Sequence, residues 1–148
     1  MLKGVVWLIK IGFDLDGTIA DIELALLHLV ENNEAAEKDY YRDRTQIFNP
    51  YLFLHEEDEG VIITSRKYGL KGITEEWLRA RNIRLPIVHE VCPHKPPDWE
   101  NIAKWKAEII KNNDLDIYID DNPTIVTILR KECPKCKVIQ YGARRSGL

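Results

Sequence analysis

The stretch that decides the fold is Phe13-Asp14-Leu15-Asp16-Gly17-Thr18, which closes a near-continuous apolar run that begins at Val5. Such a run is typical of a central parallel strand that is covered on both faces. Residues two apart on a strand project to the same side, so Asp14 and Asp16 are expected together, and Gly17 permits the sharp turn that exposes them. One carboxylate can attack an electrophile such as phosphorus while the other serves the leaving group. The alternative without a catalytic role is a capped turn, because Asp-Gly is a common turn dipeptide.

Four further apolar segments are expected to be strands. They are Val61–Thr64, Pro86–Val91, Asp116–Asp120 and Lys137–Tyr141. Helical patterns lie between them: one helix is expected to start at Thr74 as an N-cap, one to run from Asp98 to Asn113, and one to open at Pro123. Strands that alternate with helices indicate right-handed crossovers and a parallel sheet, so the predicted fold class is α/β.

The segment between the first two strands predicts a small helical flap. We assign residues 21–59 to this cap insertion, within one domain that spans residues 1–148. Ile22 to Glu37 has a helical pattern, and Tyr40 to Thr45 is interpreted as a polar bridge. The insertion is too short to be a second full domain.

Polar side chains gather at two more of the predicted strand ends. The second strand ends in Thr64-Ser65-Arg66, and the fourth ends in Asp120-Asp121. In parallel α/β sheets, ligands bind outside the carboxyl ends of the strands. Adjacent carboxylates repel each other unless a cation compensates, and Mg²⁺ prefers oxygen ligands, often one or two carboxylates plus phosphate. Helix capping before Pro123 would explain one of these aspartates but not both.

In this order, these residues resemble the four motifs of the haloacid dehalogenase (HAD) superfamily, which are Asp14-x-Asp16-Gly17-Thr18, then Thr64, a lysine, and Asp120-Asp121. The resemblance spans nearly the whole chain. It implies a three-layer Rossmann-like fold whose five-stranded parallel sheet has the order 5-4-1-2-3. It further implies a Mg²⁺-dependent phosphatase, because an aspartate at position 16 is the pattern of phosphatases rather than of dehalogenases.

The resemblance also implies roles for these carboxylates. Asp14 would become a phospho-aspartate, and Asp16 would act first as general acid and then as general base. Mg²⁺ would be held by Asp14, the backbone carbonyl of Asp16 and the side chain of Asp121, with Asp120 behind them.

Helical phase favours one lysine for the third motif. Lys106 shares the sheet-facing stripe of its predicted helix with three isoleucines, whereas Lys104 lies on the polar face. Lys106, with Thr64, is therefore expected to stabilise the charge of the phosphate and of Asp14. Lys104 stays an alternative, and so does Lys95, whose loop could also reach the site.

A narrower resemblance nominates substrate-binding residues. Ile63-Thr-Ser-Arg-Lys67, followed by Ile73-Thr74-x-x-Trp77-Leu78, is similar to the second-motif region of 5′-nucleotidase-type HAD enzymes and of polynucleotide kinase-phosphatases. In those relatives the arginine after the second motif contacts the substrate phosphate, which nominates Arg66. Gly17, Thr18 and Ser65 are assigned to the same phosphate site. The sequence contains no Walker loop of a kinase half.

The small flap predicts a site that is open on one side. An open site admits a phosphate on a bulky molecule, such as a nucleic-acid end, and the six basic residues between Arg130 and Leu148 could track its backbone. The alternatives are a mononucleotide or another small phosphorylated metabolite, with a partner subunit of a homo-oligomer supplying the missing cover. A non-catalytic nucleotide- or nucleic-acid-binding module is the rival from another class, and the intact carboxylates argue against it.

Composition excludes several classes of protein. The 148 residues carry a net charge of −3, which excludes a uniformly basic nucleic-acid binder. No apolar run approaches the roughly 20 residues of a membrane span, and a secretion signal is not recognised, so a cytoplasmic location is expected. The low, odd number of cysteines argues against a secreted disulfide scaffold. Cys133 and Cys136 have the spacing of a local disulfide, of two ordinary thiols or, with Cys92 and His94, of a zinc site.

Overall fold

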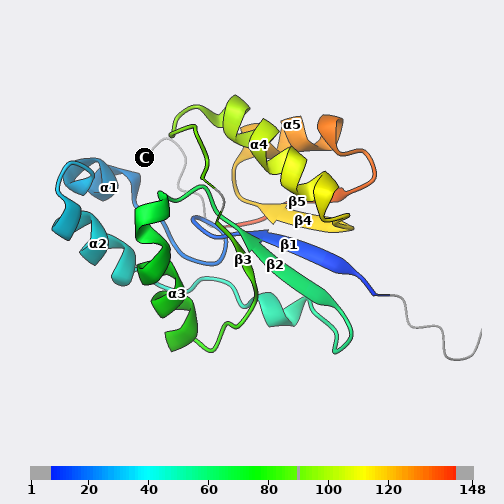
Figure 1. Ribbon diagram of the computed structural model, residues 1–148, viewed down its shortest axis with the longest axis horizontal. Helices are drawn as coiled ribbons and strands as arrows, with labels where there is room; N and C mark the ends of the chain where they lie inside the picture. Colours follow the sequence, from blue (N-terminus) through cyan, green and yellow to red (C-terminus); the bar gives the residue numbers. More distant parts are fainter. Residues whose placement is uncertain (1–7, 90, 143–148) are drawn as a thin grey trace, which may run out of the picture.

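The computed structural model describes residues 8–89 and 91–142, and its five strands form one parallel sheet (Figure 1). The strand order is β3-β2-β1-β4-β5, so the predicted order is confirmed, read from the other edge. The strands are β1 (Lys10–Asp14), β2 (Glu59–Ile63), β3 (Ile87–Val88), β4 (Ile117–Asp120) and β5 (Lys137–Gln140). The part of the expected first strand from Val5 to Trp7 lies outside the described residues, as does Glu90 of the expected third strand.

Helices cover both faces of the sheet, which gives the expected three layers (Figure 1). On one face, Ile102 of α4 and Leu129 of α5 pack with Tyr118 of the sheet, and all three are fully buried. On the other face, Trp77 of α3 packs against Phe13. The helices are α1 (Leu24–Val30), α2 (Glu34–Arg42), α3 (Lys71–Ala80), α4 (Trp99–Asn112) and α5 (Pro123–Glu132), with short 3₁₀ turns η1 (Pro50–Leu52) and η2 (Tyr68–Leu70).

Two of the predicted helix starts are confirmed and one is wrong. Asp98 caps α4 by accepting from the backbone N–H of Asn101, and Pro123 is the first residue of α5. Thr74, however, does not cap a helix, because the turn η2 leads directly into α3 three residues earlier. Thr74 is buried within α3, and its hydroxyl donates to the carbonyl of Leu70 at 2.9 Å.

The flap contains two helices, and both lie beyond the carboxyl ends of the strands (Figure 1). Asn33 separates them and caps α2 by accepting from the N–H of Ala36 at 3.0 Å. The interpretation of residues 40–45 as a polar bridge was wrong. Tyr40 and Tyr41 belong to α2 and are buried, because their rings pack against the apolar side chains of Leu70 and Ile73 near the start of α3.

The helical part of the predicted insertion is shorter than residues 21–59. Its helices end at Arg42, and the chain then returns to the body of the fold. Phe48 is buried there, with its ring centroid 6.0 Å from that of Phe13 in the central strand. The second half of the insertion is therefore part of the core rather than part of the flap.

Among the described residues, the basic side chains near the C-terminus lie away from the carboxyl ends of the strands. Arg130 and Lys131 are in the last turn of α5, and Lys135 and Lys137 precede or open β5. All four are at the amino edge of the sheet, opposite the carboxyl ends of the strands. The interpretation that they track a polymer fails for these four residues, and Arg144 and Arg145 lie outside the described residues.

Two further observations bear on the sequence expectations. Cys133 and Cys136 are buried as free thiols. In the described part of the chain, no helix has the length and apolar character that crossing a membrane requires.

Candidate active site

A buried lysine joins the first and fourth strands at their carboxyl ends. The ammonium group of Lys106 donates to Asp14 Oδ1 at 2.9 Å, to Asp120 Oδ2 at 2.8 Å and to the hydroxyl of Tyr118 at 2.9 Å. A lysine has three N–H donors, so these contacts use all of them. The geometry therefore fixes the Asp14 carboxylate from the side of α4.

The structure brings Lys106 to this position and not the other candidates. Lys106 is 1% exposed because it lies on the stripe of α4 that faces the sheet, as helical phase predicted. Lys104 and Lys95 are both exposed. The lysine that contacts Asp14 is thus the one that sequence periodicity favoured.

Asp120 is fully buried, and both oxygens of its carboxylate accept from protein donors. Oδ2 accepts from Lys106 and, at 2.7 Å, from the hydroxyl of Tyr118, while Oδ1 accepts from the N–H of Asn122 at 2.9 Å. Sequence reasoning missed Tyr118. The signal was available, since residue 118 is two before Asp120 on the same strand and must share its face.

Asp121 completes a cluster of three carboxylates. Ligand atoms from Asp14, Asp120 and Asp121 all lie within 4.8 Å of one another. Gly17 is what allows Asp121 to approach: its φ of +85° is unfavourable for other residues, and a Cβ there would collide with the Asp121 carboxylate.

The electrostatics of this cluster favour an added cation. Burial raises the pKa of Asp14 well above its usual value, Asp120 and Asp121 raise it further, and Lys106 only partly opposes them. Burial alone would lower the pKa of Lys106, but Asp120 and Asp14 outweigh it and raise that pKa. One lysine cannot neutralise three carboxylates, and an all-oxygen donor set suits Mg²⁺. The residues present therefore fit the expected magnesium ion.

Asp16 is held by a different cation, on the opposite face of the sheet. Arg66 forms a two-point contact with its carboxylate, with Nε at 3.0 Å from Oδ2 and Nη2 at 2.6 Å from Oδ1. Burial would lower the pKa of Arg66, but the contact with Asp16 outweighs it and the pKa is raised. The Arg66 side chain is directed at Asp16 and is only 1% exposed, and the expected contact with substrate phosphate stays a prediction.

The expected strand alternation does not extend to Asp16. Strand β1 ends at Asp14, and the chain then turns, with the N–H of Gly17 donating to the carbonyl of Ala20 at 2.7 Å. The turn, rather than the pleat of a strand, therefore determines where the second carboxylate points.

The remaining predicted site residues lie at the same edge of the sheet. Thr64 is buried, and its Oγ1 accepts from the N–H of Arg66 at 3.1 Å, which leaves its own proton for another acceptor. Ser65 is half-buried beside it. Thr18 is buried with Oγ1 3.4 Å from Asp14 Oδ2. Thr18 therefore contacts the carboxylate of the expected nucleophile.

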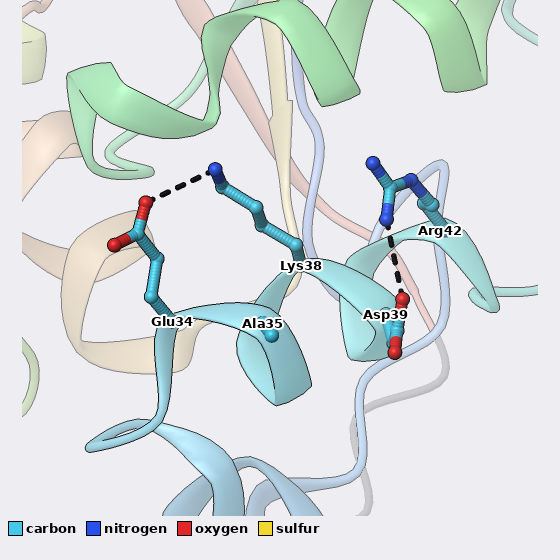
Figure 2. Close-up of a pocket in the computed structure, with 5 residues that line it drawn as sticks. All are labelled: Glu34, Ala35, Lys38, Asp39 and Arg42. Carbon is cyan, nitrogen blue, oxygen red and sulfur yellow. Dashed lines mark hydrogen bonds and ion pairs between the residues drawn. The ribbon is translucent and has the colours of Figure 1, made fainter.

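A surface hollow of about 340 Å³ lies elsewhere, along α2 (Figure 2). Its charged side chains pair with each other, Lys38 with Glu34 at 3.0 Å and Arg42 with Asp39 at 3.2 Å. The hollow is lined by Glu34, Ala35, Lys38, Asp39 and Arg42, and it contains none of the predicted site residues.

Comparisons with known proteins agree with this geometry at the level of the fold. No protein-family model and no curated protein matches the sequence. Among solved structures, a chain of the Pnkp1/Rnl/Hen1 RNA repair complex superposes with a TM-score of 0.65 at 16% identity, over 93% of this chain and 44% of that chain. The present chain thus spans less than half the length of that relative.

Two further similar structures match over most of their own length. A HAD family enzyme from Bacteroides thetaiotaomicron, in complex with magnesium and inorganic phosphate, has a TM-score of 0.56 at 9% identity, covering 95% of this chain and 98% of that one. The HAD domain of the effector protein Lem4 from Legionella pneumophila has a TM-score of 0.53 at 14% identity, covering 95% and 88%. The chain therefore has the fold of the HAD superfamily.

Proposed function

We propose that this protein is a Mg²⁺-dependent phosphomonoester hydrolase that works through an aspartyl-phosphate at Asp14. The observation that carries the proposal is the contact of Lys106 with Asp14 and Asp120 at the carboxyl ends of neighbouring strands. A structural ion pair would need one carboxylate, whereas Lys106 contacts two, and the carboxylate of Asp121 lies within 4.8 Å of both. Such crowding of like charge is characteristic of sites that bind a cation and an anionic substrate.

In the first step, an oxygen of Asp14 forms a bond to phosphorus and the bond to the leaving oxygen breaks. Lys106 orients the attacking carboxylate, and Lys106 and Thr64 stabilise the charge that moves onto the phosphoryl oxygens. Asp16 enters this step as the protonated acid, gives its proton to the leaving oxygen and becomes a carboxylate. In the second step, this carboxylate takes a proton from water, whose oxygen attacks phosphorus and releases phosphate from Asp14, and the acid form of Asp16 is restored.

The magnesium site would comprise the side chains of Asp14 and Asp121 and the carbonyl of Asp16. Asp120 would stand behind them, because its two oxygens already accept from Lys106, Tyr118 and a backbone N–H. When bound, the ion would offset the repulsion between substrate phosphate and the carboxylates. Gly17, Thr18 and Ser65 would line the phosphate site beside it.

For the substrate, we propose a nucleotide or the phosphorylated end of a nucleic acid. Three exposed lysines lie at the carboxyl edge, namely Lys67 after β2, Lys71 at the start of α3 and Lys95 before α4. They could bind a phosphodiester backbone that continues from the site. The likeness to a chain from an RNA repair complex supports the same substrate class.

Replacement of the nucleophile tests the reaction. In Asp14→Asn, a carboxamide of nearly the same shape replaces the carboxylate, and Lys106 keeps its ion pair with Asp120. We expect hydrolysis of an aryl phosphate to fall below about 1% of wild type while the thermal unfolding midpoint stays close to that of wild type. Turnover above that level in a folded variant would contradict the assignment of Asp14.

The two aspartates after β4 should separate into a metal ligand and a structural partner. We expect Asp121→Ala to raise the Mg²⁺ concentration needed for half-maximal activity at least about tenfold, with little loss of stability. Asp120→Ala should instead destabilise the fold by about 1–3 kcal/mol, because it leaves the Tyr118 hydroxyl without its buried acceptor and removes one of the two carboxylates that Lys106 contacts. Mg²⁺ titration and urea unfolding of both variants measure this. The opposite pattern would exchange the two roles.

The substrate class can be tested with matched lysine variants. We expect Lys71→Gln combined with Lys95→Gln to lower kcat/KM for a 5′- or 3′-phosphorylated oligonucleotide, and to reduce its loss of activity between about 50 and about 200 mM salt. Lys135→Gln combined with Lys137→Gln, at the amino edge, is the control and should change neither. Equal salt dependence for the oligonucleotide and an aryl phosphate, or no oligonucleotide turnover, would refute the nucleic-acid substrate. The protein would then be a phosphatase of small molecules.

A further inference from the structure

Arg66 is enclosed by protein groups from three separate elements. Nε and Nη2 contact the Asp16 carboxylate, and Nη1 donates to the hydroxyl of Thr74 in α3 at 3.1 Å. The guanidinium carbon lies 4.4 Å from the ring centroid of Tyr41, which belongs to the flap helix α2. The arginine is 5% exposed.

These contacts hold the guanidinium group of Arg66 in one orientation. Two of its nitrogens donate to the two oxygens of the Asp16 carboxylate, and this paired contact fixes the plane of the carboxylate as well as its distance. Thr74 cannot move away, because it sits inside α3 and its own proton is donated to Leu70. The backbone of Arg66 is tied as well, through its N–H to Thr64 Oγ1 at 3.1 Å.

Asp16 is less buried than the arginine that holds it. Its side chain is 22% exposed, against 1% for the side chain of Arg66. Each carboxylate oxygen can accept more than one hydrogen bond, so Asp16 can still meet a leaving oxygen or a water molecule from the open side. Arg66 has no such open side.

We infer that Arg66 is a positioning residue, which aims the Asp16 carboxylate at the leaving oxygen and then at the attacking water, and that Tyr41 of the flap and Thr74 of α3 hold it there. The inference rests on the proposed hydrolase function. It replaces the expectation that Arg66 contacts substrate phosphate. The flap would then do more than cover the site, because Tyr41 of α2 packs against the arginine that holds Asp16.

The two roles of Arg66 predict different kinetic defects. A positioning residue affects the steps in which Asp16 moves a proton, which are departure of a poor leaving group and hydrolysis of the phosphoenzyme. A phosphate ligand affects binding of every phosphate compound. An aryl phosphate with a good leaving group needs little protonation, so it separates phosphoenzyme formation from breakdown.

The experiment compares Arg66→Lys, Arg66→Gln, Thr74→Val and Tyr41→Leu with the wild-type protein. Stopped flow measures the rate of the first release of nitrophenolate from a nitrophenyl phosphate, which reports phosphoenzyme formation. Steady-state turnover is then measured on that ester and on an alkyl phosphate. Inorganic phosphate, used as a competitive inhibitor, gives an inhibition constant that reports phosphate binding. Arg81→Gln is the matched control. Like Arg66, Arg81 lies over an aromatic ring, 3.8 Å from the centroid of Trp77, but it donates to backbone carbonyls instead of a carboxylate and lies away from the site.

For both Arg66 variants we expect the rate of first phenolate release to stay within about threefold of wild type. Alkyl phosphate turnover and phosphoenzyme breakdown should fall by about 10²-fold or more, with the inhibition constant of phosphate little changed. Arg66→Lys should share the defect, because a lysine keeps the positive charge but lacks the planar pair of donors that contacts both carboxylate oxygens. Thr74→Val and Tyr41→Leu should lower the same two rates by a smaller factor, and Arg81→Gln should leave all rates at their wild-type values.

Several results would overturn the inference. A tenfold or larger rise in the inhibition constant of phosphate, with equal losses on both esters, would make Arg66 a phosphate ligand. Should the Arg66 variants fail to fold, wild-type kinetics in both Thr74→Val and Tyr41→Leu would refute the positioning role. A wild-type protein that hydrolyses neither ester with Mg²⁺ would refute the proposed function itself, and the inference with it.

Discussion

The buried ammonium of Lys106 is the group on which the candidate site depends. Moving an unpaired ammonium into a protein interior costs several kcal/mol, so it is stable there only if its partners are in place. Those partners come from two neighbouring strands, with Asp14 at the end of β1, Asp120 at the end of β4 and Tyr118 two residues earlier on β4. The parallel pairing of β1 with β4 and the docking of α4 over them are what bring these atoms together.

The carboxylates of Asp14 and Asp16 are each held by one buried cation, and the two cations approach from opposite faces of the sheet. Lys106 reaches Asp14 from the side of α4, and Arg66 reaches Asp16 from the side of α3 and the flap. Strand β1 ends at Asp14, so Asp16 lies in the turn that follows, and each of the two aspartates has its own partner. In the proposed mechanism this division suits their tasks, because the nucleophile and the proton carrier must be held independently.

Much of the fold and site could be predicted from the sequence because the informative signals are local. Apolar runs were sufficient for the parallel strands, the family resemblance for their order, and helical phase for the choice of Lys106, whose burial follows from its place on the stripe of α4. The contacts of Arg66 could not be predicted in this way. The contact with Asp16 joins residues 50 positions apart, and the sequence pattern predicts a helix cap at Thr74 and a polar bridge at Tyr41 rather than partners of an arginine. The periodicity of apolar residues does not indicate which hydroxyl or aromatic ring will pack against a guanidinium from another segment, so these contacts could not be predicted from it.

The central claim is that Asp14 becomes covalently bound to phosphorus during turnover. The most direct measurement is acid quenching of the protein with Mg²⁺ and a nitrophenyl phosphate, followed by intact mass spectrometry and peptide mapping. The account predicts one phosphoryl group per chain, located on the peptide that contains Asp14 and absent from Asp14→Asn. Hydrolysis without any adduct under conditions in which breakdown is slowed, or a phosphoryl group on a histidine or cysteine instead, would contradict it.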